Sequence, residues 1–170
     1  MVRPGATTCL PPPRQRRCPR LRRLWQTLAL LRQRVRAVVV ADSSVWIDFL
    51  RGTVNPATDE LARLLGGGGV RLVVPDLVLF EVLRGFRQEH DYRQAQRLMK
   101  SVGIEPTGGE ALVTAAAQHY RALRQGGVTP RSAIDVLLAA FCIERDYLLL
   151  HADRDFDAFE ASRGLRAWRH

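Results

Sequence analysis

Two short apolar segments, 37–41 and 147–150, each lead into acidic residues, and this pattern constrains the fold more than any other feature of the chain. The first segment is β-branched and ends at Asp42, and the second is leucine-rich and is followed closely by Asp153. Short, continuous apolar runs are typical of buried strands in parallel sheets. Open α/β sheets bind their ligands beyond the carboxyl ends of such strands. We therefore expect both acids at the functional edge of a parallel sheet.

Two further acids lie within apolar helices. Glu81 has apolar neighbours on both sides, and Asp135 stands alone in an apolar helix that ends near Glu144. A carboxylate in such a setting is unfavourable to bury without a partner. Two alternatives remain open at this point. One is that Glu81 forms an ion pair with Arg84, three residues later on the same helix face. The other is that Asp42 is only a helix cap.

A divalent cation would explain all four acids together. Carboxylates that converge on one pocket repel one another unless a cation joins them. Hard oxygen ligands select Mg²⁺ or Mn²⁺, and such clusters usually act on phosphate esters. We therefore predict a metal site formed by Asp42, Glu81, Asp135 and Asp153.

Three polar residues surround the fourth acid, and each has its own interpretation. Asp155 follows Asp153 by two residues, and we expect it to assist at the site. Asp157 is interpreted as the cap of a short helix over 158–162. His151 is a conceivable general base, but a hydrogen-bonded structural role is favoured for a single histidine at a strand end.

The rest of the chain alternates strands and helices, which predicts a parallel sheet covered on both faces. Ser44 is the expected N-cap of the first helix. The predicted strands are 37–41, 70–74, 102–105, 147–150 and 165–168, and the predicted helices are 44–51, 57–65, 75–86, 91–101, 110–125 and 129–144, with a short one at 158–162.

The acidic segments, taken together, resemble the PIN-domain ribonucleases, and most closely the VapC toxins of bacterial toxin–antitoxin pairs. The resemblance rests on segments 40–47, 81–85 and 149–156 and on the alanine-rich helix around Asp135, in this order and at these spacings. It covers nearly all of the chain after residue 36. It implies a three-layer α/β/α domain with a parallel central sheet and Mg²⁺- or Mn²⁺-dependent cleavage of RNA.

The same resemblance assigns roles to individual residues. Carried over, Asp42, Glu81, Asp135 and Asp153 are the acidic quartet, and Asp155 is an auxiliary acid. Ser44 matches the small polar residue that follows the first acid of the family by two positions. His151 departs from the family, where many members have Thr or Ser.

The expected reaction is hydrolysis of an RNA phosphodiester by metal-activated water, which yields 5′-phosphate and 3′-hydroxyl ends. Arg84, Arg87 and Arg154 are candidate phosphate contacts because they lie close to the acids in sequence. Two alternatives are weighed against this function. One is a degenerate PIN module that only binds RNA or a partner, and the other is a haloacid-dehalogenase-type phosphatase, which needs a second Asp where Ser44 stands.

The resemblance also implies a cognate antitoxin that lays a peptide into a groove near the acids and offers them an arginine. A homodimer is expected as well, because two helices contain more large apolar side chains than a small sheet needs. These side chains are Trp46, Phe49, Leu50, Phe80 and Phe86. The chain has three cysteines and no apolar run long enough to span a bilayer, so we expect a cytoplasmic protein without a membrane partner.

The charge of the chain is concentrated at its N-terminal end. Residues 1–36 contain ten arginines and no acid, whereas residues 37–170 contain 16 basic and 17 acidic residues. The net charge of +9 therefore comes from the extension and not from the expected domain at 37–170. Three interpretations of the extension are weighed. It binds RNA or an anionic membrane surface electrostatically, or it is a signal segment. The third, which is favoured, is that it is an over-extended start or a dispensable arm.

Overall fold

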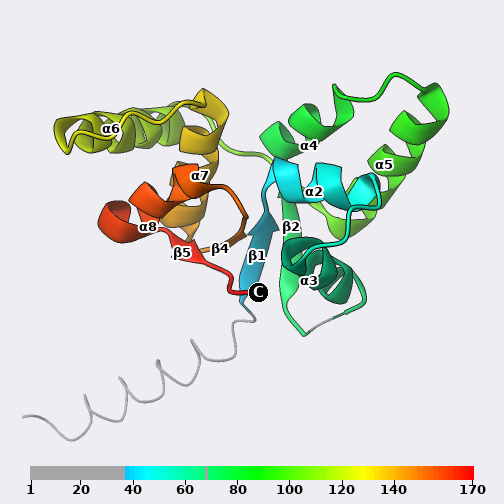
Figure 1. The fold of residues 1–170 in the computed structure, drawn as a ribbon. Helices are drawn as coiled ribbons and strands as arrows, with labels where there is room; N and C mark the ends of the chain where they lie inside the picture. The colour runs from blue at the N-terminus through cyan, green and yellow to red at the C-terminus, as the bar shows by residue number, and fades with distance from the viewer. Residues whose placement is uncertain (1–36, 68) are drawn as a thin grey trace, which may run out of the picture. The chain divides into compact units, whose positions relative to one another are not determined.

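Five short strands form the centre of the protein in the computed structural model, which describes residues 37–67 and 69–170 (Figure 1). They are β1 (Val38–Ala41), β2 (Arg71–Pro75), β3 (Ile104–Glu105), β4 (Leu148–Leu150) and β5 (Arg166–Ala167). The strand order is β3-β2-β1-β4-β5, and all four pairings are parallel. In the central register Val40 lies beside Val73 on one side and Leu149 on the other. Successive strands are added on one side of β1 as far as β3 and then on its other side from β4. Open α/β sheets bind ligands at such a switch point, here beyond the carboxyl ends of β1 and β4.

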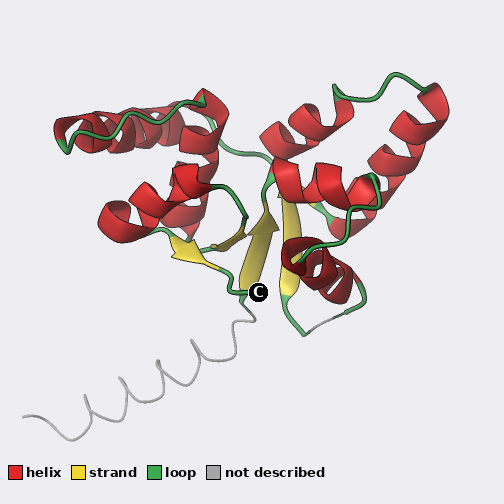
Figure 2. Cartoon of the chain, in the orientation of Figure 1, coloured by secondary structure: helices red, strands yellow, loops and turns green. Residues whose placement is uncertain are grey.

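Helices lie on both sides of these strands (Figure 2). The helices are α2 (Ser43–Leu50), α3 (Pro56–Leu65), α4 (Asp76–Leu83), α5 (Glu89–Val102), α6 (Glu110–Gln125), α7 (Ala133–Arg145) and α8 (Asp157–Arg163), with a 3-10 helix η1 (Arg154–Phe156) before the last. In Figure 1, α2 to α5 lie on one side of the strands and α6 to α8 on the other. The arrangement is a three-layer α/β/α fold, as the alternation of elements predicts.

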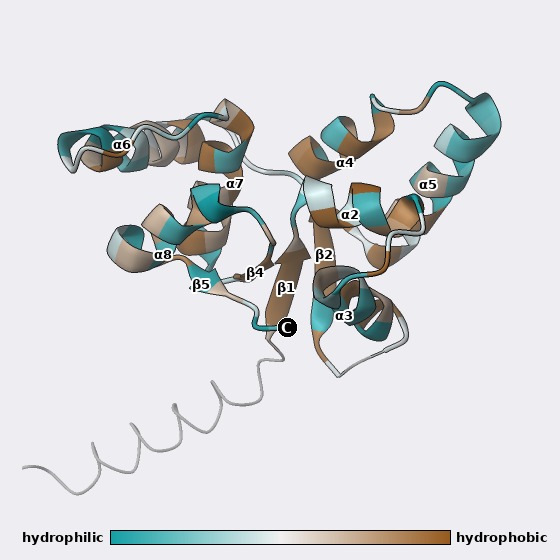
Figure 3. Ribbon diagram, in the orientation of Figure 1, coloured by the Kyte–Doolittle hydropathy of each residue, from teal (hydrophilic) through white to brown (hydrophobic). Residues whose placement is uncertain are grey.

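The strands are apolar because both faces of the sheet are covered. Figure 3 shows β1 and β2 in brown, whereas the outer helices carry both apolar and hydrophilic residues. Val39, Val40 and Leu149 have no exposed surface. The large side chains Phe141 and Phe159 fill the core from α7 and α8. A parallel sheet between two helical layers requires continuous apolar strands of this kind.

The structure contains every predicted strand and helix, but two predicted helix caps are wrong. Asp42, and not Ser44, is the N-cap of α2, because Asp42 is the last residue with extended backbone and its carboxylate accepts the Ser44 N–H. Asp157 is the first residue of α8 and makes no capping hydrogen bond. Asp153 instead caps the preceding η1. Ser132 caps α7, so that helix begins at Ala133 and not at 129–131.

The expected apolar patch on α2 and α4 is smaller than predicted. Trp46 is completely buried, and Phe49 packs against it edge-on with 6.5 Å between the ring centres. Leu50 and Phe86 are partly buried against the core. Phe80 alone of these residues is strongly exposed, at 59% of its surface. The large side chains of the two helices therefore serve mainly to attach them to the sheet.

The basic extension predicted at residues 1–36 lies outside the described residues. Within the described part of the chain, no helix has both the length and the apolar character that a membrane crossing requires.

Candidate active site

Asp42 lies where β1 passes into α2, and its side chain is held in place. Its backbone N–H donates to the Leu150 carbonyl of β4 at 2.9 Å, so the ends of the two central strands are joined. Its carboxylate accepts hydrogen bonds from both the backbone N–H and the hydroxyl of Ser44. Only 3% of its surface is exposed. Asp42 therefore does cap α2, as the alternative interpretation proposed. Capping alone does not explain why a carboxylate is this deeply buried.

Glu81 projects from the middle of α4, the helix that follows β2. Its side chain is 14% exposed, and one oxygen lies 3.7 Å from an Arg84 nitrogen. That separation is an ion pair without a hydrogen bond. The predicted pairing with Arg84 is thus present but loose, and it leaves the carboxylate available to another cation.

Asp135 lies in the first turn of α7, and its pKa links the four predicted acids. Its backbone N–H donates to the Ser132 hydroxyl at 3.2 Å. The pKa of the Asp135 carboxyl is raised to about 6, first by burial and then by the negative charge of Asp42, while the hydrogen bond with Ser132 opposes the rise. Smaller contributions in the same direction come from Glu81 and Asp153. The charges of the other three predicted acids therefore reach Asp135, although Asp42 and Glu81 do not belong to the close group that it forms with Asp153 and Asp155.

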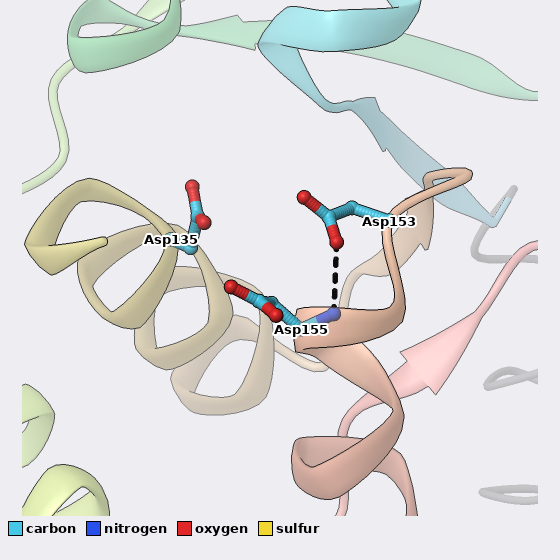
Figure 4. Close-up of side chains that lie close together, drawn as sticks. All are labelled: Asp135, Asp153 and Asp155. Carbon is cyan, nitrogen blue, oxygen red and sulfur yellow. Dashed lines mark hydrogen bonds between the residues drawn. The ribbon is translucent and has the colours of Figure 1, made fainter. Parts of the chain in front are cut away.

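The tightest group of acids contains Asp135, Asp153 and Asp155 (Figure 4). One carboxylate oxygen from each lies within 4.8 Å of the others. Asp153 also accepts the Asp155 N–H at 2.9 Å, which shapes the turn that brings both acids toward α7. Asp155, expected only to assist, thus lies within the candidate site itself.

Arg131 is the residue that sequence reasoning missed. Its Nε donates to one oxygen of Asp155 at 3.0 Å and its Nη2 donates to the other at 2.7 Å. These hydrogen bonds hold the pKa of the Asp155 carboxyl below its usual range. No local pattern could have revealed the pair, because its members are 24 residues apart. The only sequence signal was an arginine four residues before an acid already assigned to the site.

The three arginines predicted to contact phosphate are all exposed. Arg84 lies beside Glu81 and over the ring of Phe80, with 5.8 Å to the ring centre. Arg87 lines a groove between α2, α4 and α5. Arg154 is part of η1, between two acids of the cluster. All three guanidinium groups are therefore accessible to a phosphate.

His151 has the structural role that its position favoured. The imidazole is buried and packs on the Phe156 ring, with ring centres 4.9 Å apart. One ring nitrogen lies 3.0 Å from the Asp153 carbonyl oxygen and the other lies 3.0 Å from a Glu160 oxygen. Both nitrogens are therefore used, and the histidine fixes the backbone that presents Asp153.

The donor set fits a hard divalent cation. All the acids offer oxygen ligands, which Mg²⁺ and Mn²⁺ prefer. Burial and, after it, the negative charge of Asp42 raise the pKa of Asp135, so part of the shift reflects repulsion between carboxylates. A cation at this position would relieve that repulsion. Asp42, Glu81, Asp135 and Asp153 are the residues that could hold it, and Asp155 lies beside Asp135 and Asp153 with both oxygens bound by Arg131.

Known proteins share this sequence pattern. A family model described as the PIN domain matches residues 39–161. The chain is 30% identical over 130 residues to VapC ribonuclease Mb1587 of Mycobacterium bovis and to Ribonuclease VapC11 of Mycobacterium tuberculosis. Each match spans 76% of this chain and 97% of the relative.

Solved structures share the fold at much lower identity. VapBC2 from Rickettsia felis, bound to a promoter DNA fragment, matches with a TM-score of 0.62 and 14% identity over 78% of this chain and 99% of that chain. VapBC-1 from nontypeable Haemophilus influenzae matches with a TM-score of 0.59 and 16% identity over 77% and 96% of the two chains. The predicted PIN-like α/β/α fold is thereby confirmed. The chain belongs to the PIN domain family, in its VapC branch.

Proposed function

We propose that this protein is a metal-dependent endoribonuclease and the toxin of a toxin–antitoxin pair. The observation that carries the proposal is the close group formed by Asp135, Asp153 and Asp155, whose carboxylate oxygens lie within 4.8 Å of one another, beside the joined ends of β1 and β4 where Asp42 lies. Relatives named as ribonucleases at 30% identity support the same activity.

Asp42, Glu81, Asp135 and Asp153 would hold Mg²⁺, for which Mn²⁺ is a possible substitute. When bound, the ion supplies Lewis-acid chemistry: it lowers the pKa of water and neutralises charge on the phosphodiester. The protein's own residues supply the geometry. Ser44 donates to Asp42 and so fixes the direction of that carboxylate. The buried end of β1 excludes bulk water from one side of the site.

Water, and not the ribose 2′-oxygen, is the nucleophile in this scheme. Cleavage therefore leaves 5′-phosphate and 3′-hydroxyl ends. Arg84, Arg87 and Arg154 are proposed to contact phosphates of the RNA on either side of the scissile bond, since exposed guanidinium groups bind phosphate well.

Cleavage is tested on a mixture of short structured and single-stranded RNAs with EDTA, Mg²⁺ or Mn²⁺. We expect cleavage with either metal and none with EDTA, and end-labelling should show 5′-phosphate products. Asp135→Asn should lose activity. Asp157→Asn is the matched control, because Asp157 is an exposed acid that follows the cluster and has no predicted role in it. Equal cleavage with EDTA would contradict the proposal.

The proposed partner is a cognate antitoxin. A groove of about 490 Å³ lies between α2, α4 and α5, and Ile47, Leu50, Val82 and Phe86 contribute apolar surface to it. Val82 in the groove is the chain neighbour of Glu81 on α4, so we expect an arginine of a peptide bound here to reach toward that acid. The solved structures of similar fold include VapBC toxin–antitoxin complexes, which supports this partner.

The toxin role and the homodimer have separate tests. Expression of the protein alone should slow growth, expression of Asp135→Asn should not, and coexpression with the neighbouring gene should relieve the effect. Harmless expression of the active protein would contradict the toxin role. The proposed homodimer would bury Phe80, so sedimentation should show a dimer at micromolar concentration that Phe80→Ser weakens. A strict monomer would refute it.

A further inference from the structure

We propose that Arg131 is a phosphate-contacting residue of the site and that Asp155 serves to orient it and does not hold the metal. The inference rests on the proposed RNA cleavage and adds one arginine to its substrate contacts. Its starting point is the position of the guanidinium, which binds Asp155, and a carboxylate oxygen of Asp155 lies within 4.8 Å of oxygens of Asp135 and Asp153.

The geometry leaves much of the guanidinium free. Arg131 uses Nε and one Nη2 hydrogen to bind the two oxygens of Asp155. An arginine has five N–H donors, so three remain. Among the described residues, Arg131 has no acceptor other than Asp155, and its side chain is 78% exposed. A positioned fork with free donors facing solvent matches the nonbridging oxygens of a phosphate.

The Arg131–Asp155 ion pair is not needed for the stability of the fold. An ion pair this exposed contributes little to folding, because water screens it and two long side chains lose freedom. The pair instead fixes the position of the guanidinium beside the acids. Both oxygens of Asp155 already accept hydrogen bonds from a cation, whereas the described residues offer the Asp135 carboxylate no ion pair of this kind. The acids of the close group therefore divide into Asp135 and Asp153, which have no arginine partner among the described residues, and Asp155, which has its own.

This division predicts opposite effects on metal and RNA when the arginine is removed. Arg131→Gln takes a positive charge away from the acids, so Mn²⁺ should bind at least about threefold more tightly. The same change removes a charged phosphate contact, so KM for an RNA that the parent cleaves should rise about tenfold. The dependence of RNA binding on salt should weaken by about one unit of slope. Simple loss of structure would weaken both metal and RNA binding.

Three further variants complete the experiment. Arg131→Lys keeps the charge without the fork and should give a KM between those of the parent and Arg131→Gln. Asp155→Asn should raise KM in the parent background but add little in Arg131→Gln, because Asp155 acts through the arginine. Arg63→Gln is the matched control: Arg63 binds both oxygens of Glu60 in the same way, but on α3, which supplies none of the acids. Its KM and Mn²⁺ affinity should equal those of the parent.

The outcomes are distinct. An unchanged or lower KM in Arg131→Gln, with the parent active, would overturn the inference and leave the proposed function intact. Loss of kcat and of Mn²⁺ affinity in Asp155→Asn at constant KM would also overturn it, since Asp155 would then be a metal ligand with Arg131 as its counter-ion. A parent that binds Mn²⁺ but cleaves no RNA would overturn both.

Discussion

Replacing Asp135 by Asn should stabilise the metal-free protein while it removes activity. The pKa of this carboxyl rises from 3.8 to about 6 on folding, chiefly through burial and the charge of Asp42. At 1.36 kcal/mol per pKa unit, the ionised group would destabilise the fold by about 3 kcal/mol. Asp135 is partly exposed, so solvent screening reduces this figure to about 1–2 kcal/mol. Asn has the same shape and no charge, and the Ser132 hydroxyl still accepts the backbone N–H.

The sign of the pH dependence follows from the raised pKa. Between the unfolded value near 3.8 and the folded value near 6, the folded state binds the proton more tightly than the unfolded state does. The contribution of Asp135 to stability is therefore fully present below the unfolded value and is lost as the pH rises through 6. The advantage of Asp135→Asn should be largest at pH 7.5 and should shrink as the pH falls toward 4.

Urea unfolding in EDTA measures the difference directly, and added Mg²⁺ should reverse it. A ligand that binds only the folded state stabilises it by RT ln(1 + L/Kd), where L is the free ligand concentration. The parent should gain stability with Mg²⁺, and Asp135→Asn should gain much less. Equal or lower stability of Asp135→Asn in EDTA at pH 7.5 would contradict the predicted cost of the buried, repelled Asp135 charge.

Three further predictions concern other parts of the molecule. Asp42→Asn should abolish cleavage but keep the fold, since Asn also caps helices well; undiminished cleavage would refute the assignment. A protein that lacks residues 1–36 should fold, bind Mn²⁺ and cleave a short RNA, and loss of folding would disprove this. If the extension adds nonspecific affinity, its removal should also weaken the salt dependence of RNA binding. Burial, and then the charge of Arg163, lower the pKa of His119, so its contribution to stability is complete above the unfolded value near 6.5 and is lost as the pH falls. His119→Gln should therefore lose less stability between pH 7.5 and 5 than the parent, and parallel curves would contradict it.

Local sequence patterns determined the strands and the identity of the acids. The run before Asp42 predicts a buried strand because only apolar, β-branched residues suit a sheet covered on both faces. The acids were recognisable because Glu81 and Asp135 stand in apolar surroundings where an unpartnered carboxylate is unfavourable. Both signals are contained within a few residues of the chain, so both could be interpreted before any fold was known.

The tertiary structure decided what these residues contact. Ser44 and Asp42 are both good caps by composition, and only the backbone conformation assigns the cap to Asp42. Trp46 looked like interface surface, but its helix packs that face into the core. The pairing of Arg131 with Asp155 joins two segments that are separated by the whole of α7 and β4. Contacts of that kind depend on how elements pack, and a linear pattern contains no record of which distant side chains the packing brings together.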